Sequence, residues 1–132
     1  MVLVDTDVMV ECLRGSLAAN NWLQTQPKEA FAVPGVVAME LLTGCRNQLE
    51  VQQIRKFLTT FNVAWPDASE FARAYELLAN YRLASGISIP DCLIAAMALA
   101  RSARLYTFNL KHFQIVSGLD ARQPYQRQTA VE

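Results

Sequence analysis

Val2-Leu3-Val4-Asp5-Thr6-Asp7 opens the chain with three apolar residues that end abruptly at two acids flanking a threonine. Such a short apolar run, stopped by polar residues, is typical of a buried strand that ends at a turn. Asp and Thr are favoured where helices begin, and Val8, Met9 and Cys12 follow at helical spacing up to Gly15. The opening residues therefore predict a buried strand followed directly by a helix.

Short apolar runs alternate with helical patterns along the rest of the chain. Further strands are expected at 30–33, 61–65 and 104–108, with one more short strand after Gly118. Helices are expected at 17–26, 36–43, 49–58, after Asp67 and over 92–100. Parallel strands need long connections, which helices supply. The pattern predicts an α/β fold, a three-layer α/β/α sandwich with a short parallel sheet of four to five strands.

Length and composition indicate an ordinary globular chain. Its 132 residues predict one domain over 1–132, with a polar tail after about residue 118. The 12 Lys and Arg residues balance the 12 Asp and Glu residues, so no global field favours nucleic acid or membranes. Three widely spaced cysteines in apolar runs are typical of buried thiols in a reducing compartment. No apolar stretch approaches the ~20 residues that span a bilayer, which predicts a cytoplasmic protein without a membrane partner.

Three acids, Asp5, Glu40 and Asp91, are candidates for a functional site, although two of them also suit an ordinary structural role at a helix start. Asp5 follows the first strand and Asp91 opens the most apolar helix, where helix capping and the helix dipole already favour aspartate. Asp7 exceeds what capping alone requires. Glu40 lies in an apolar helix between Met39 and Leu41, where a carboxylate needs a cation as partner.

Together the acids predict a metal site at the carboxyl ends of the strands, where parallel α/β sheets bind their ligands. If Asp5, Glu40 and Asp91 share one pocket, their charges coexist at neutral pH only through protonation or a divalent cation. Oxygen ligands select Mg²⁺ or Mn²⁺, and a water on such an ion can attack a phosphodiester. This combination predicts nuclease chemistry.

Four segments resemble the PIN domain and, within it, the VapC-like toxins of bacterial toxin–antitoxin pairs. In chain order they are VLVDTDVMVECLRG, VVAMELLTG, IPDCLIAAMALA and LYTFNLKHF. The similarity extends from Val2 to about Phe113. Each segment alone is a weak match, whereas the four in this order are quite specific.

The resemblance implies roles for particular residues. Asp5, Glu40 and Asp91 match the metal-binding acids and are expected to be both metal ligands and catalytic residues. Asn109 falls where many relatives carry a fourth acid, and is expected to orient a water or phosphate. Asp7 stands where the family more often has Asn or Ser. The site therefore either binds Mg²⁺ more weakly than in relatives with four acids, or recruits Asp7 for the missing charge.

The implied activity is Mg²⁺-dependent endoribonuclease cleavage, with Mn²⁺ as a possible substitute, that leaves 5′-phosphate and 3′-hydroxyl ends. The implied partners are the RNA substrate, a cognate VapB-like antitoxin and a second copy of the chain in a homodimer. His112 has no partner at metal-ligand spacing, and a histidine in such a position is more often a surface residue than a ligand. A local excess of basic residues over 101–127 is either a phosphate-contacting patch or solvated surface. Its members are Arg101, Arg104, Lys111, Arg122 and Arg127.

Alternative functions have partial support in the sequence. One is an inactive PIN-like module that binds RNA or antitoxin, which Asn109 keeps open. Another is an aspartate-based phosphatase, because the residues from Asp5 to Met9 approximate its nucleophile loop, although Met9 stands where that loop has Thr or Val. A phospho-accepting receiver domain fits the length, but its phosphorylated aspartate belongs after a third strand, where the strand at 61–65 ends in Pro66-Asp67 without the expected pattern.

Overall fold

A five-stranded parallel sheet forms the centre of the protein, whose computed structural model describes residues 1–127. The strands are β1 (Val2–Val4), β2 (Phe31–Pro34), β3 (Asn62–Ala64), β4 (Arg104–Tyr106) and β5 (Ala121–Arg122). Their order across the sheet is β3-β2-β1-β4-β5, and every neighbouring pair is parallel. The strand that opens the chain is therefore the central one, and the predicted α/β fold with a parallel sheet is confirmed.

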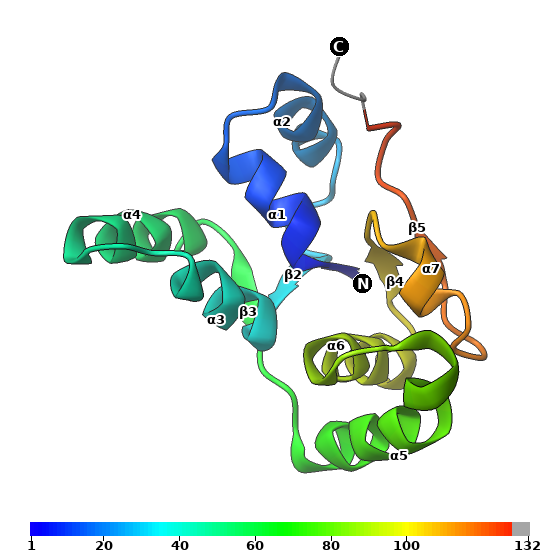
Figure 1. Cartoon of the computed structure of the whole chain (residues 1–132). Coiled ribbons are helices and arrows are strands. Elements are labelled where there is room, and N and C mark those ends of the chain that lie inside the picture. Colours follow the sequence, from blue (N-terminus) through cyan, green and yellow to red (C-terminus); the bar gives the residue numbers. More distant parts are fainter. Residues whose placement is uncertain (128–132) are drawn as a thin grey trace, which may run out of the picture.

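Seven helices connect the strands within residues 1–127. They are α1 (Thr6–Leu13), α2 (Leu17–Gln24), α3 (Gly35–Thr43), α4 (Gln48–Leu58), α5 (Ala68–Ser85), α6 (Ile89–Ala100) and α7 (Leu110–Phe113). Helices α1 and α2 lie on one side of the sheet and α5 and α6 on the other (Figure 1). The single-turn helix α7 is absent from the sequence prediction, because four residues carry no readable period.

The core lies between the sheet and the apolar faces of the helices. Leu3 and Val4 of the central strand β1 and Leu105 of its neighbour β4 are fully buried. Helix α6 is buried nearly all round, as its apolar composition predicts, and it packs against α5. The three cysteines are free thiols, of which Cys12 and Cys92 are buried and Cys45 is partly buried. No helix in residues 1–127 is both long and apolar enough to cross a membrane.

Local side-chain chemistry sets the helix ends. Asp67 caps α5 as predicted, and Glu70 completes a capping box by accepting a hydrogen bond from the Asp67 backbone N–H. Gly86 ends the same helix with φ of 74°, in the left-handed region where glycine has no steric cost. Asp5 caps α1, so its predicted structural role is confirmed.

Strand β4 ends two residues earlier than predicted. Beyond Tyr106, the backbone N–H groups of Phe108 and Asn109 donate to the side chains of Asp7 and Thr107 instead of to a neighbouring strand. After β5, residues 123–127 of the predicted polar tail lie alongside α1 and α2 (Figure 1). The last part of that tail, residues 128–132, falls outside the described residues.

Candidate active site

Asp5 is the most deeply buried acid at the carboxyl edge of the sheet, with 6% of its surface exposed. Its Oδ1 accepts a hydrogen bond from the Thr6 backbone N–H at 2.8 Å, and its Oδ2 accepts one from Thr107 Oγ1 at 2.7 Å. Burial, followed by the charge of Asp7, raises the pKa of Asp5 to about 7. The carboxyl group is therefore held in place but disfavours its own charge at neutral pH.

Asp7 is also directed into the protein and does not share the capping role. Its Oδ2 accepts a hydrogen bond from the Phe108 backbone N–H at 3.1 Å, which ties α1 to the segment after β4. Its Oδ1 is buried and has no hydrogen-bond partner within residues 1–127. Burial raises the pKa of Asp7, while the positive charge of Arg127 opposes that change. A buried carboxylate oxygen without a partner is a ready acceptor for a cation or water.

Glu40 reaches the same edge from α3. Its Oε1 accepts a hydrogen bond from Thr6 Oγ1 at 2.8 Å. Thr6 stands between Asp5 and Asp7 in the chain, so this bond brings Glu40 to the segment that carries both acids. The expectation of an apolar environment around Glu40 is wrong. Met39 is 57% exposed and Glu40 itself is only half-buried, because this side of α3 faces outward.

Asp91 lies in the first turn of α6, beside the segment that follows β4. His112 Nδ1 stands 3.3 Å from Asp91 Oδ2 and 2.9 Å from Asn109 Nδ2. The negative charge of Asp91 also contributes, as a smaller cause than burial, to the raised pKa values of Asp5 and Asp7. His112 stays partly exposed, with 30% of its side chain accessible, and it contacts two of the predicted site residues.

The structure thus gathers the predicted site residues along one edge of the sheet, joined by three side chains to which the sequence assigns no role in the site. These are Thr6, Thr107 and His112. Thr107 is fully buried, and it donates to Asp5 while accepting from the Asn109 backbone N–H. The position of Thr107 directly after β4 was a usable indication, because that place is where site residues of parallel sheets occur.

The donor set fits a divalent cation held by few direct ligands. Within residues 1–127, no three His, Cys, Asp or Glu side chains come close enough to hold one ion together. Mg²⁺ characteristically keeps several waters and needs only one or two carboxylates. Asp5, with its raised pKa, and the unpartnered oxygen of Asp7 both gain from a nearby cation.

Four of the five basic residues of 101–127 form ion pairs with carboxylates. Arg101 pairs with Glu70, Arg104 and Arg122 both pair with Asp120, and Arg127 pairs with Glu11. These pairs divide the positive charges among different parts of the molecule. Four of these five positive charges therefore lie beside carboxylates, and Arg127 also lies close enough to Asp7 to affect its pKa.

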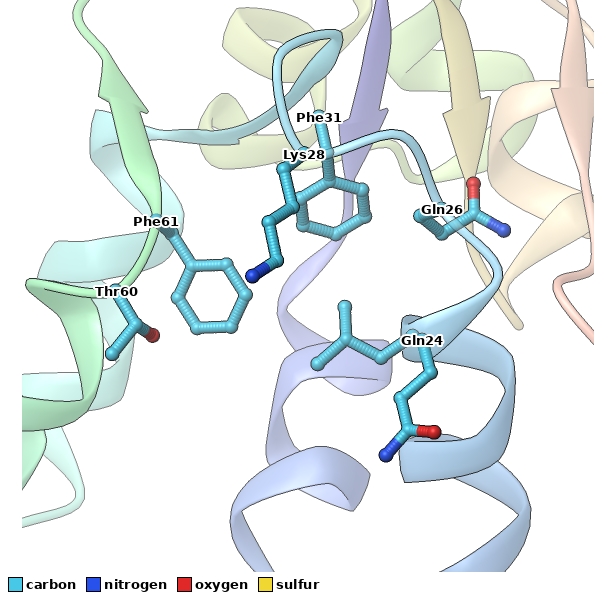
Figure 2. A pocket seen from close by; sticks show the side chains of 7 residues that line it. Gln24, Gln26, Lys28, Phe31, Thr60 and Phe61 are labelled. Atoms are coloured by element: carbon cyan, nitrogen blue, oxygen red, sulfur yellow. The ribbon is translucent and has the colours of Figure 1, made fainter.

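A separate hollow of about 240 Å³ lies near the amino ends of β2 and β3, opposite the acidic edge. Phe31 and Phe61 form its apolar wall, and the ammonium group of Lys28 extends between them (Figure 2). None of its lining residues is acidic. This hollow therefore offers a cation no carboxylate ligand.

Fold and site together define a class: a small parallel α/β domain with carboxylates clustered beyond the central strand. Residues 2–119 match the family model of the PIN domain. The chain belongs to the PIN domain family, as the four segments predict.

The relatives are similar over almost the whole chain. Ribonuclease VapC10 of Mycobacterium tuberculosis is 32% identical over 120 residues, which cover 90% of both chains. Ribonuclease VapC19 of the same organism is 36% identical over 130 residues, covering 95% of this chain and 100% of the relative. A toxin–antitoxin complex from Klebsiella pneumoniae contains a chain with a TM-score of 0.78 and 25% identity, covering 96% of this chain and 100% of that one.

Proposed function

We propose that this protein is a metal-dependent endoribonuclease and the toxin of a VapBC-type toxin–antitoxin pair. The observation that carries the proposal is the set of linked carboxylates around buried Asp5, in a chain whose relatives are named ribonucleases. The phosphatase and receiver alternatives have no support from the fold, because the chain belongs to the PIN domain family.

In this proposal Asp5 and Asp91 hold Mg²⁺, or Mn²⁺ in its place, and Glu40 contributes directly or through water. When bound, the cation lowers the pKa of a water and stabilises charge that develops on the phosphate. Thr107 fixes the orientation of Asp5, and Thr6 fixes that of Glu40. Asn109 orients the water or the phosphate. Hydrolysis then leaves 5′-phosphate and 3′-hydroxyl ends.

The proposed protein partners are a VapB-like antitoxin and a second copy of the chain. A groove of about 750 Å³ runs between α1, α3 and α4 and includes Glu40, so a segment bound there would reach the acidic edge. Its lining includes apolar Val10 and Leu41 beside charged Arg14 and Arg46, which suits an amphipathic peptide. The exposed apolar side chains of Phe71, Tyr75 and Ile89 border one hollow between α5 and α6, and such a contiguous surface favours a homodimer. We propose that the protein and its antitoxin act in the cytoplasm.

Removal of single carboxylates tests the metal site directly. We expect Glu40→Gln and Asp91→Asn each to abolish Mg²⁺-dependent cleavage of RNA while the chain stays folded, because each removes an acid from the proposed site. Glu76→Gln removes an equally negative but exposed residue of α5 and should keep full activity. Cleavage of a labelled RNA with Mg²⁺ or with a chelator is the measurement. Full activity of both site variants would exclude the proposed site.

A fourth acid should strengthen metal binding. We expect Asn109→Asp to lower the Mg²⁺ concentration for half-maximal cleavage, because Asn109 lies beside His112 and Asp91 at the same edge. A Mg²⁺ titration of the initial rate measures this. An unchanged or higher midpoint would contradict the role given to position 109.

The alternative function, a module that binds RNA or antitoxin without cleaving RNA, predicts a different experimental result. Such a chain would bind RNA or antitoxin but would release no product with Mg²⁺ or Mn²⁺. The same assays, run on the unaltered chain, separate this alternative from the nuclease.

A further inference from the structure

The segment 123–127 is fastened to α1 by Glu11. Tyr125 Oη donates a hydrogen bond to Glu11 Oε1 at 2.8 Å, and Arg127 Nε donates to Glu11 Oε2. The Tyr125 ring meets Phe108 edge-on with centroids 5.2 Å apart. The side chain of Glu11 is only 18% exposed, so this carboxylate is a partly buried anchor for two groups from the far end of the chain.

Arg127 is placed next to the acidic edge. Its guanidinium carbon stands 4.1 Å from the centroid of the Phe108 ring, and the backbone N–H of Phe108 donates to Asp7. Stacking on the ring and pairing with Glu11 hold the planar group in one orientation. The Arg127 guanidinium therefore lies over the ring of Phe108, the residue whose backbone N–H binds Asp7 at the acidic edge.

Most donors of this guanidinium remain available for another group. Arginine has five N–H donors, and within residues 1–127 Glu11 takes only the one on Nε. The two Nη groups form an edge that matches two oxygens of a phosphate. Arg101 pairs with Glu70, and Arg104 and Arg122 pair with Asp120, and neither of these carboxylates belongs to the acidic edge.

We propose that Arg127 binds an RNA phosphate beside the acidic edge, with Glu11 and Phe108 as the residues that position its guanidinium. This inference rests on the proposed function and names a substrate contact for it. The protein has no net charge, so a polyanion must be held by local cations of this kind.

The test measures the binding of a fluorescent single-stranded RNA by anisotropy at several salt concentrations, with a chelator present to prevent cleavage. We expect Arg127→Met to weaken binding roughly fivefold and to lower the salt slope by about 0.7, the loss of one phosphate contact to a single strand. Arg73→Met removes the same charge from an exposed position on α5 and should match the unaltered chain. Binding by Arg127→Met within twofold of the unaltered chain, or an equal loss in Arg73→Met, would overturn the proposal.

Two further variants separate phosphate binding from simple anchoring of the segment. Tyr125→Phe removes one hydrogen bond to Glu11 and keeps the Arg127 charge, so its melting temperature should fall while the salt slope stays unchanged. Arg127→Lys should keep the slope but bind more weakly than arginine, since an ammonium lacks the two-pronged edge. A slope lowered as much by Tyr125→Phe as by Arg127→Met would assign the effect to anchoring and overturn the proposal.

Failure of this inference is distinguishable from failure of the proposed function. If the unaltered chain binds RNA but never cleaves it with Mg²⁺ or Mn²⁺, the nuclease proposal fails and the binding comparison still decides the role of Arg127. If the chain neither cleaves nor binds RNA, both proposals are overturned.

Discussion

Asp5→Asn is expected to yield a protein that cleaves no RNA and yet unfolds less readily than the unaltered chain at pH 8. The loss of activity should be roughly a thousandfold or more, because a metal ligand stabilises transition-state charge by several kcal/mol. The gain in stability has a different origin. Asp5 is buried, and its carboxylate pays for desolvation that a neutral amide of the same shape avoids.

The stability effect depends on pH with a definite sign. The pKa of Asp5 rises from 3.8 in an unfolded chain to about 7 in the fold, so the folded state binds this proton more tightly. This tighter proton binding stabilises the folded state fully at pH values below the unfolded pKa of 3.8. The stabilisation is lost as pH rises through the folded pKa of about 7. The full loss corresponds to roughly 4 kcal/mol as an upper limit. An amide next to Thr107 leaves the threonine hydroxyl proton without its acceptor, which offsets about 1–3 kcal/mol of the gain.

Urea unfolding at pH 4.5 and pH 8, with a chelator present, measures this difference. Effects of other titrating groups largely cancel when the two proteins are compared at the same pH. We expect the advantage of Asp5→Asn to grow with pH, and added Mg²⁺ to stabilise only the unaltered chain. An advantage that is equal at both pH values would contradict the raised pKa, and retained cleavage would exclude Asp5 from the site.

Arg101→Met is expected to cause the largest loss of stability, about 3–5 kcal/mol, because it leaves a buried carboxylate without its partner. Glu70 is only 2% exposed, and Arg101 donates to both of its oxygens at 2.8 and 2.9 Å. The Arg101 guanidinium also donates to the Trp65 carbonyl oxygen at 2.9 Å. These bonds join the end of α6 to the start of α5 and the end of β3.

The direction of the pH dependence follows from Glu70. Hydrogen bonding to Arg101 lowers the pKa of Glu70, so the pair stabilises the fold above the unfolded pKa of about 4.5. That contribution is lost as pH falls through the lower folded pKa. The deficit of Arg101→Met should therefore be largest near pH 7 and should shrink as pH falls below 4.5 and Glu70 becomes protonated.

A double variant shows whether the unpaired charge is the cause. Glu70→Gln retains an oxygen for the capping box with Asp67, so Arg101→Met combined with Glu70→Gln should be more stable than Arg101→Met alone. Unfolding free energies of the four proteins complete the cycle. An unfolding free energy of Arg101→Met that lies within about 1 kcal/mol of that of the unaltered chain would show that solvent reaches Glu70 and that the ion pair contributes little to stability.

The elements of the fold were predictable because their determinants are local. The apolar run before Asp5, the cap at Asp67 and the proline at 90 act through residues only a few positions away. Predictions failed where a distant side chain intervened. Strand β4 is shorter than its apolar pattern suggests because Asp7, about a hundred positions earlier, accepts the Phe108 backbone N–H.

The sequence by itself determined the parallel α/β fold and the four candidate residues Asp5, Glu40, Asp91 and Asn109. Strand ends and helix starts are local features, and parallel strands bring their carboxyl ends to one edge. Only the tertiary structure decided which groups hold those residues. Thr107 donates a hydrogen bond to Asp5, and His112 contacts the carboxylate of Asp91. The tertiary structure likewise divided the basic residues among separate carboxylates, because pairing energies depend on proximity in space and burial, which spacing along the chain does not encode.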